Sequence, residues 1–176
     1  MIKTLFFDNE AVMILDQSQL PDKVEYVRCK TIEAVADAIK KLKVRGAPLI
    51  GVTAAFGLAM AMANYQRETA GMQDYFQQAR ATLACTRPTA VNLFWALERM
   101  EKVFLQEFAT QANREQIGKR LKQEAINMYE EDITINRAIG EYGQTLLPEG
   151  SQVMTICNAG ALATCGYGTA LGVIRA

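Results

Sequence analysis

The sequence contains no histidine. This absence excludes Ser-His-Asp triads, Cys-His dyads and metal sites built on imidazole. Any acid–base chemistry must therefore use cysteine, aspartate, glutamate, lysine or tyrosine side chains.

The sequence also lacks an excess of charge, since 19 Lys and Arg residues balance 19 Asp and Glu residues. Proteins that bind nucleic acid through phosphate attraction need a surplus of basic residues. We therefore predict no nucleic-acid partner, although a balanced total is compatible with a local positive pocket.

Cysteine is scarce and irregularly spaced. The four cysteines are Cys29, Cys85, Cys157 and Cys165, and no C-x-x-C pair is present, which argues against a zinc knuckle or a thioredoxin motif. No signal-peptide pattern is visible in residues 1–10. We therefore expect a cytoplasmic protein with free thiols, in which Cys29 and Cys85 are packing residues.

No apolar run is long enough to cross a membrane. Residues 46–66 carry no charge, but their strongly apolar part is residues 49–62, and glycine and threonine dilute it. A spanning helix needs about 20 consecutive apolar residues. We predict a helix buried in a protein core and no membrane partner.

Hydrophobic periodicity predicts a small β-rich lead-in followed by helices. In the lead-in, residues 1–30, we expect strands at 11–15 and 24–29. Thr31 is a candidate N-cap for the first helix. We also expect Trp95 to lie in the core, with a stacking platform for a ligand as the less common alternative. The predicted helices are residues 32–42, 48–62, 72–85, 88–108 and 117–143.

The last part of the chain has a different pattern. Residues 153–156 form an apolar run typical of a buried strand, a glycine-containing loop follows, and residues 170–174 are typical of a helix. One strand and one helix cannot bury both faces of a parallel sheet. We predict an α/β fold overall, with a helical N-terminal domain (1–147) and the start of an incomplete Rossmann-like domain (148–176). A larger protein or a partner chain would complete it.

Three residues stand just before predicted helix starts: Arg45, Arg87 and Cys157. Two guanidinium groups and free helix amides suit a phosphate, and a cysteine near such amides is favoured as thiolate. If the three converge, they would form a site for an anion and a thiol. The alternatives are that Arg45 pairs with a carboxylate and that Cys157 is buried and inert.

Asp132 and Asn136 stand one helical turn apart. Residues at this spacing lie on the same side of a helix and can hydrogen-bond. We expect a surface pair here, and a supporting role behind an active site is the less common alternative.

Four segments of the chain resemble the methylthioribose-1-phosphate isomerase family. They are LDQSQLPDKVEYVRCKT, VRGAPLIGVTAAFGLA, TRPTAVNLFWAL and CNAGALATCGYGTALGVIRA, and they occur in the family's order. The resemblance implies an aldose–ketose isomerase of methionine salvage, usually a homodimer, that uses no metal or nucleotide cofactor. It also implies that Cys157 is catalytic and that Arg45, Gly46, Ala47 and Arg87 contact the substrate around its phosphate.

Two departures from the family pattern affect these expectations. Ile156 stands where the family often has histidine. The family's catalytic aspartate belongs to its second half, which has no counterpart here, so we expect the chain alone to lack half of its site. The alternatives are the related ribose-1,5-bisphosphate isomerase, a regulatory subunit of a translation-initiation exchange factor, and an inactive truncated product.

Overall fold

The computed structural model describes residues 3–176, so the first two residues of the predicted lead-in lie outside the described range. The lead-in forms an antiparallel sheet of β1 (Leu5–Asp8), β2 (Ala11–Leu15) and β3 (Tyr26–Cys29), in the order β1-β2-β3. The strand at 11–15 is confirmed. The second predicted strand begins at Tyr26 rather than at residue 24, where Val24 is 56% exposed, and β1 was not predicted.

The helical pattern is confirmed with shifted boundaries. The side chain of Thr31 caps the first helix by accepting a hydrogen bond from the N–H of Ala34 at 3.3 Å. Short 3-10 turns lie at Gln17–Gln19, Thr69–Gly71 and Ala161–Ala163. The α-helices are α1 (Ile32–Lys40), α2 (Ala47–Ala63), α3 (Met72–Ala84), α4 (Val91–Ala109), α5 (Arg114–Gln144) and α6 (Ala170–Arg175).

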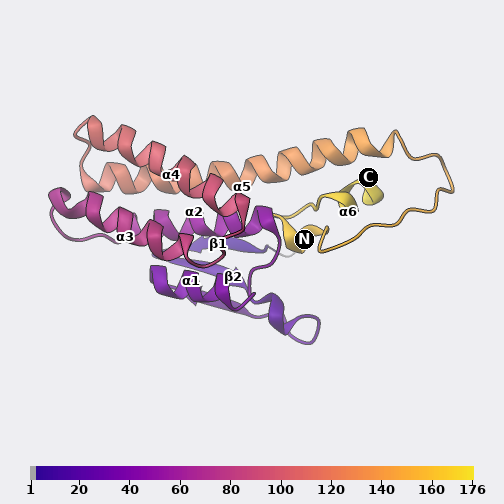
Figure 1. Cartoon of the computed structure of the whole chain (residues 1–176), viewed down its shortest axis with the longest axis horizontal. Helices are drawn as coiled ribbons and strands as arrows, with labels where there is room; N and C mark the ends of the chain where they lie inside the picture. The colour runs from indigo at the N-terminus through magenta and orange to yellow at the C-terminus, as the bar shows by residue number, and fades with distance from the viewer. Residues whose placement is uncertain (1–2) are drawn as a thin grey trace.

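Helix α2 forms the centre of the molecule. It lies between the sheet with α1 on one side and the pair α4 and α5 on the other (Figure 1). Every residue from Leu49 to Met62 is buried, which confirms the predicted core helix. The Phe56 ring stacks on Phe7 of β1, with centroids 4.2 Å apart. No helix within residues 3–176 is long and apolar enough to cross a membrane.

Glycines let neighbouring helices approach α2 closely. A Cβ atom on Gly51 would lie 2.5 Å from the backbone oxygen of Asn92, which is in the first turn of α4. A Cβ atom on Gly118 of α5 would lie 3.0 Å from the Cα of Ala63. Helix axes can come this close only where one side chain is missing.

A partly buried ionic network ties α4 to α5. Glu124 is only 6% exposed and accepts hydrogen bonds from Arg99 Nε at 2.7 Å and Arg120 Nη1 at 2.9 Å. Arg99 also binds Glu131, with its Nη2 atom 2.7 Å from Oε1. Burial alone would raise the pKa of Glu124, but the hydrogen bonds from Arg120 and Arg99 outweigh it and lower the pKa.

Several expectations for the region around α4 are wrong. Helix α4 begins at Val91, so Pro88 lies in the preceding turn and does not open the helix. Cys85 is exposed rather than packed, whereas Cys29 is buried as predicted. Trp95 is 48% exposed rather than a core residue, because it lies beside an open cavity.

The predicted strand at residues 153–156 is not formed. These residues run in an exposed loop, and Met154 and Ile156 are 97% and 89% exposed. A strand needs a neighbouring strand for its backbone N–H and C=O groups, and none lies beside this segment within residues 3–176. Helix α6 then packs on the far end of α5, where Gly140 and Gly143 make room for Tyr167 and Val173.

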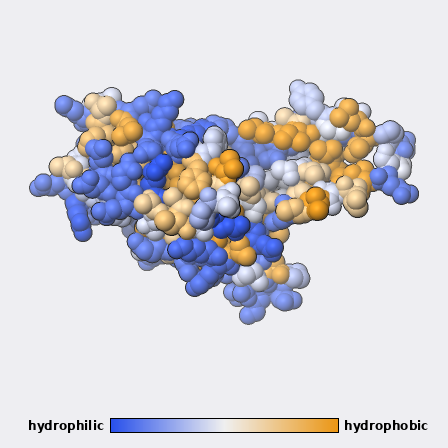
Figure 2. Space-filling model, viewed as in Figure 1, coloured by the Kyte–Doolittle hydropathy of each residue, from blue (hydrophilic) through white to orange (hydrophobic). Residues whose placement is uncertain are grey.

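Apolar side chains gather on the surface in this C-terminal region. Figure 2 shows them along the second half of α5 and around α6. Unpartnered apolar surface of this kind is typical of a face that another chain or domain covers. The most exposed members on these elements are Ile135, Ile139, Tyr142, Leu171 and Ile174.

We predict that Gly51→Ala destabilises the chain by about 1–3 kcal/mol, because the added methyl group meets a backbone atom that cannot rotate away. Gly57→Ala in the same helix is the control, since its Cβ would meet the Val35 side chain at 3.0 Å, which can shift. Both substitutions replace glycine by alanine inside α2, so the gain in helix propensity is the same for both variants. Urea denaturation checks the prediction, which is contradicted if Gly51→Ala is as stable as Gly57→Ala.

We predict that Glu124→Gln lowers the free energy of unfolding at pH 7 by about 1–3 kcal/mol, because two arginines lose their charged acceptor. A carboxylate whose folded pKa is lowered stabilises the fold above its unfolded pKa of 4.5 and loses this effect as the pH falls through the folded value. The difference between the two proteins therefore shrinks below pH 4.5 in denaturation curves.

The control for this experiment is Glu115→Gln, also in α5. Glu115 forms an exposed pair with Lys119 at 2.7 Å, and solvent screens such a pair so that it contributes little to stability. An equal loss for both variants, or a difference that does not depend on pH, would contradict the role assigned to Glu124.

Candidate functional site

The turn of Arg45, Gly46 and Ala47 leaves the start of α2 open. Gly46 is the N-cap, with φ at 97°, and no side chain caps the helix. Helix α2 begins at Ala47, one residue before its predicted start, and Pro48 lies in its first turn. Arg45 is exposed and has no carboxylate partner among residues 3–176, so the alternative of a simple ion pair is not observed.

The same turn packs against the loop that follows Cys157. A Cβ atom on Gly46 would lie 2.4 Å from both the Cα and the carbonyl oxygen of Ala163. Gln17 also holds this loop by donating a hydrogen bond to the Leu162 carbonyl at 2.7 Å. Glycine is therefore required at position 46 both for the positive φ and for this close approach. The two segments that sequence analysis selected are thus neighbours.

Cys157 is exposed and adopts a positive φ of 70°, which is uncommon for a residue other than glycine. Its expected position just before a helix is wrong. A three-residue 3-10 turn begins at Ala161, and α6 begins only at Ala170. The alternative of a buried cysteine is also wrong, because Cys157 is exposed.

Arg87 lies half-buried in the turn between α3 and α4, and its carbonyl accepts a hydrogen bond from the N–H of Ala90 at 3.0 Å. The residues that follow it bring the start of α4 next to the start of α2. Val91 and Asn92 share a cavity with Pro48. The starts of α2 and α4 therefore lie next to each other. The side chains of Arg45, Arg87 and Cys157 do not line the cavity between them.

This cavity has a volume of about 500 Å³ and opens between α2, α4, α5 and the N-cap of α6. Its size is that of a site for a small molecule. Its walls carry mainly apolar side chains with two carboxylates. We call it the helix-start cavity; lining residues that matter below are Pro48, Val91, Trp95, Met128, Asp132 and Thr169.

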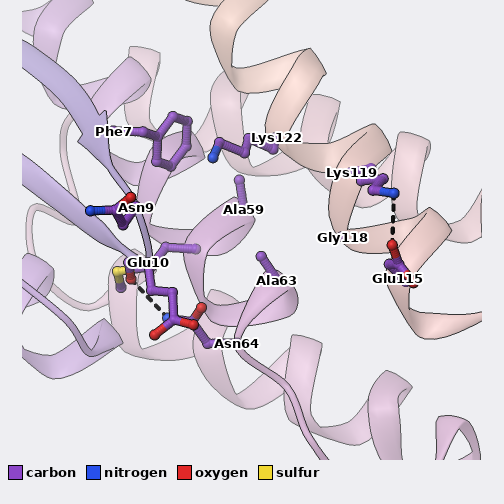
Figure 3. A pocket seen from close by; sticks show the side chains of 11 residues that line it. Phe7, Asn9, Glu10, Ala59, Ala63, Asn64, Glu115, Gly118, Lys119 and Lys122 are labelled. Carbon is purple, nitrogen blue, oxygen red and sulfur yellow. Dashed lines mark hydrogen bonds and ion pairs between the residues drawn. The ribbon is translucent and has the colours of Figure 1, made fainter.

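A second hollow, of about 260 Å³, lies at the opposite end of α2, beside residues 59–64 (Figure 3). Its cations already have partners. Lys119 pairs with Glu115 at 2.7 Å, and the Lys122 amino group lies 4.8 Å from the centre of the Phe7 ring. It is remote from every residue that sequence analysis selected, so the helix-start cavity is the better candidate site.

Asp132 is a functional candidate that sequence analysis underestimated. Its Oδ2 atom accepts a hydrogen bond from the backbone N–H of Cys165 at 2.7 Å, and Oδ1 accepts one from Asn136 Nδ2 at 3.1 Å. Asn136 is only 3% exposed and Asp132 is half-buried, so the expected surface pair is in fact a partly buried one. The i, i+4 spacing revealed the pair but not its contact with the loop at Cys165.

Burial shifts the titration of this cluster. It raises the pKa of the Asp132 carboxyl, although the hydrogen bond from Cys165 acts in the opposite direction. Burial, together with the neighbouring Asp132, also raises the pKa of the Cys165 thiol, so this cysteine is not a candidate nucleophile. Asp132 thus anchors the end of the loop that begins at Cys157. No cluster of three or more metal-ligating side chains was found within residues 3–176.

Comparison with known proteins places these features in a family. The methylthioribose-1-phosphate isomerase of Syntrophomonas wolfei is 60% identical over 175 residues, which cover 99% of this chain and 50% of that protein. The protein of the same name from Thermotoga maritima is 53% identical over 174 residues, covering 99% and 49%. The chain therefore spans about half the length of these curated relatives.

Solved structures have the same fold. The 5-methylthioribose 1-phosphate isomerase of Pyrococcus horikoshii superimposes with a TM-score of 0.90 at 40% identity, covering 99% of this chain and 49% of that one. The translation initiation factor eIF-2B subunit delta of A. fulgidus gives 0.87 at 41% identity, covering 99% and 50%. Residues 43–176 match the family described as "Initiation factor 2 subunit family". This chain therefore belongs to the initiation factor 2 subunit (IF-2B) family.

Proposed function

We propose that this chain supplies the N-terminal part of an aldose–ketose isomerase that converts 5-methylthioribose 1-phosphate to 5-methylthioribulose 1-phosphate. One observation carries the proposal: a relative named for this activity is 60% identical across 99% of the chain. At 60% identity, this chain and that relative share most of their side chains as well as the fold. The reaction needs no metal or nucleotide cofactor in this proposal, and it belongs to methionine salvage in the cytoplasm.

The turn of Arg45, Gly46 and Ala47 binds the substrate phosphate together with Arg87. The uncapped N–H groups at the start of α2 suit an anion, and the exposed Arg45 has no competing carboxylate partner. A guanidinium group can bind phosphate oxygens through two hydrogen bonds. This assignment rests on the family resemblance of the four residues and is supported by the open geometry of the turn.

Cys157 is the proposed catalytic group of this chain. The reaction must open a sugar ring whose C1 carries phosphate and then transfer hydrogen from C2 to C1. A thiol beside the bound phosphate can move a proton during these steps. The packing of Gly46 on Ala163 supports this assignment, because it holds the loop after Cys157 against the phosphate-binding turn.

The second half of the site comes from a segment like the remaining half of the curated relatives. Residues 151–156 are exposed and have no strand partner within residues 3–176, so they are available as an edge of a Rossmann-like sheet. Val153, Met154 and Ile156 would be buried by such pairing. The segment that corresponds to the second half of the relatives would also supply the aspartate that works with Cys157. The complete assembly would be a homodimer.

A regulatory or binding role is the second candidate. The similarity to the solved eIF-2B subunit delta, at a TM-score of 0.87, favours it. A subunit of that kind would need the apolar surface of α5 and α6 for assembly but would not need a reactive thiol. Turnover that depends on Cys157 distinguishes the two roles.

We predict that the chain alone does not convert methylthioribose 1-phosphate and that co-expression with the C-terminal half of the Syntrophomonas wolfei relative restores turnover. Cys157→Ala should lower kcat of this assembly by about 100-fold or more, the usual contribution of a proton-transferring group. The control is Cys85→Ala, which removes another exposed thiol. A coupled assay measures the rates, and full activity of Cys157→Ala would contradict the catalytic assignment.

We predict that Thr155→Pro prevents assembly with the same C-terminal half. Proline removes a backbone N–H that a sheet would use, while residue 155 has no hydrogen-bond partner to lose among residues 3–176. The variant should therefore retain the stability of the chain within about 0.5 kcal/mol. Size-exclusion chromatography of the mixture checks the prediction, with Thr155→Ala as control. Co-elution of the proline variant would show that this segment is not part of the shared sheet.

A further inference from the structure

The end of the lead-in carries two buried polar side chains that the proposed reaction leaves unexplained. Asp16 and Gln17 belong to the first of the four segments that resemble the family, and they are 4% and 7% exposed. Burial of polar groups costs free energy unless they are hydrogen-bonded, so their partners indicate what they do. Each has a partner just before the turn of residues 45–47, here the Arg45 turn, or in the loop after Cys157.

Residues 16 and 17 are bonded to the segment that leads into the Arg45 turn. The backbone N–H of Gln17 donates to the Lys43 carbonyl at 3.0 Å. One Asp16 carboxylate oxygen lies 2.9 Å from the Lys43 amino group, and the other accepts hydrogen bonds from Ser18. Burial would raise the pKa of the Asp16 carboxyl, but the hydrogen bonds from Ser18 and Lys43 lower it. The carboxylate therefore stays charged and keeps Lys43 close.

The side chain of Gln17 contacts the loop after Cys157. Its amide NH2 group donates to the Leu162 carbonyl at 2.7 Å, inside the 3-10 turn of that loop. A carbonyl oxygen can only accept, so this contact requires a donor on the side chain at position 17. One residue therefore bonds both segments, the first through its backbone and the second through its side chain.

Other elements also hold this part of the loop, each at a different residue. These contacts are Gly46 on Ala163, the Thr4 hydroxyl on the Thr164 carbonyl at 3.3 Å, and Asp132 on the N–H of Cys165 at 2.7 Å. The hydrogen bond from Gln17 is the one of this set that lies nearest in sequence to Cys157. Within residues 3–176, Gln17 is also the only residue outside the two segments that hydrogen-bonds to both of them.

We propose that Gln17 is a positioning residue that sets where the Cys157 thiol lies relative to a phosphate bound at the Arg45 turn. It acts through the loop rather than on the substrate, by holding the 3-10 turn after Cys157 against the segment before Arg45. The proposal rests on the proposed function and adds a residue to its site. A displacement of about 1 Å from the productive geometry can cost about 100-fold in rate, so one such hydrogen bond affects kcat.

The first experiment measures Gln17→Met in the assembly with the C-terminal half of the Syntrophomonas wolfei relative. Methionine has a similar size and shape but no donor, and the backbone N–H of residue 17 keeps its bond to Lys43. The variant should lower kcat by about 10-fold or more and leave KM for methylthioribose 1-phosphate within about 2-fold, because the phosphate contacts remain while the thiol is displaced. The matched control is Gln19→Met, since Gln19 is exposed, and it should change neither constant.

The second experiment measures amide hydrogen exchange of the ¹⁵N-labelled chain by itself, and it needs no turnover. The N–H groups of Ala163 and Thr164 donate to carbonyls within the loop, at 3.0 and 3.4 Å, so their exchange rates report local opening of the loop. Gln17→Met should raise these rates by about 5-fold or more, which corresponds to the loss of one hydrogen bond. Exchange rates in α2 should stay unchanged.

The outcomes separate this inference from the proposed function. Unchanged kcat, a raised KM at constant kcat, or wild-type exchange rates at Ala163 and Thr164 would each overturn the role of Gln17. Equally faster exchange throughout α2 would also overturn it, because Gln17 would then serve the stability of the whole fold. If the wild-type assembly shows no turnover, the proposed function is contradicted, and the exchange rates still decide whether Gln17 holds the loop.

Discussion

The burial of α2 on all sides is the constraint on which the rest of the structure depends. A helix without a polar face must be surrounded by other elements, and here the sheet, α1, α3, α4 and α5 surround it. Each large apolar side chain that it removes from water contributes about 1.5–3 kcal/mol. Gly51 and Gly118 set how closely α4 and α5 approach, so the positions of the helix starts follow from the packing of this one helix.

The same constraint explains why the functional features gather at one end of α2. Its start carries no capping side chain, and Gly46 leaves space in which the loop after Cys157 can pack. Asp132 fixes the other end of that loop through Cys165. Residues far apart in the sequence thus meet beside the helix-start cavity, with the proposed phosphate contacts at its edge and an apolar interior formed by α4 and α5.

Sequence patterns predicted the elements whose environment is local. The periodicity of α1, the uncharged run of α2 and the long polar face of α5 each indicated the correct helix. Sequence patterns gave wrong predictions where the structure of a segment depends on contacts with residues far away in the sequence. Residues 153–156 have the composition of a buried strand but no strand beside them, and Trp95 is apolar but lies in a cavity wall. The contact between Asp132 and Cys165 could not be predicted, because it joins residues 33 positions apart.

The central claim is that the turn of Arg45, Gly46 and Ala47 holds the substrate phosphate beside Cys157. The most direct measurement is a crystal structure of the chain assembled with the C-terminal half of its Syntrophomonas wolfei relative, with methylthioribose 1-phosphate bound. The account predicts phosphate oxygens on the N–H groups at the start of α2, with the sugar between them and the Cys157 thiol. Phosphate bound instead beside Lys119 and Lys122, at the other end of α2, would contradict it.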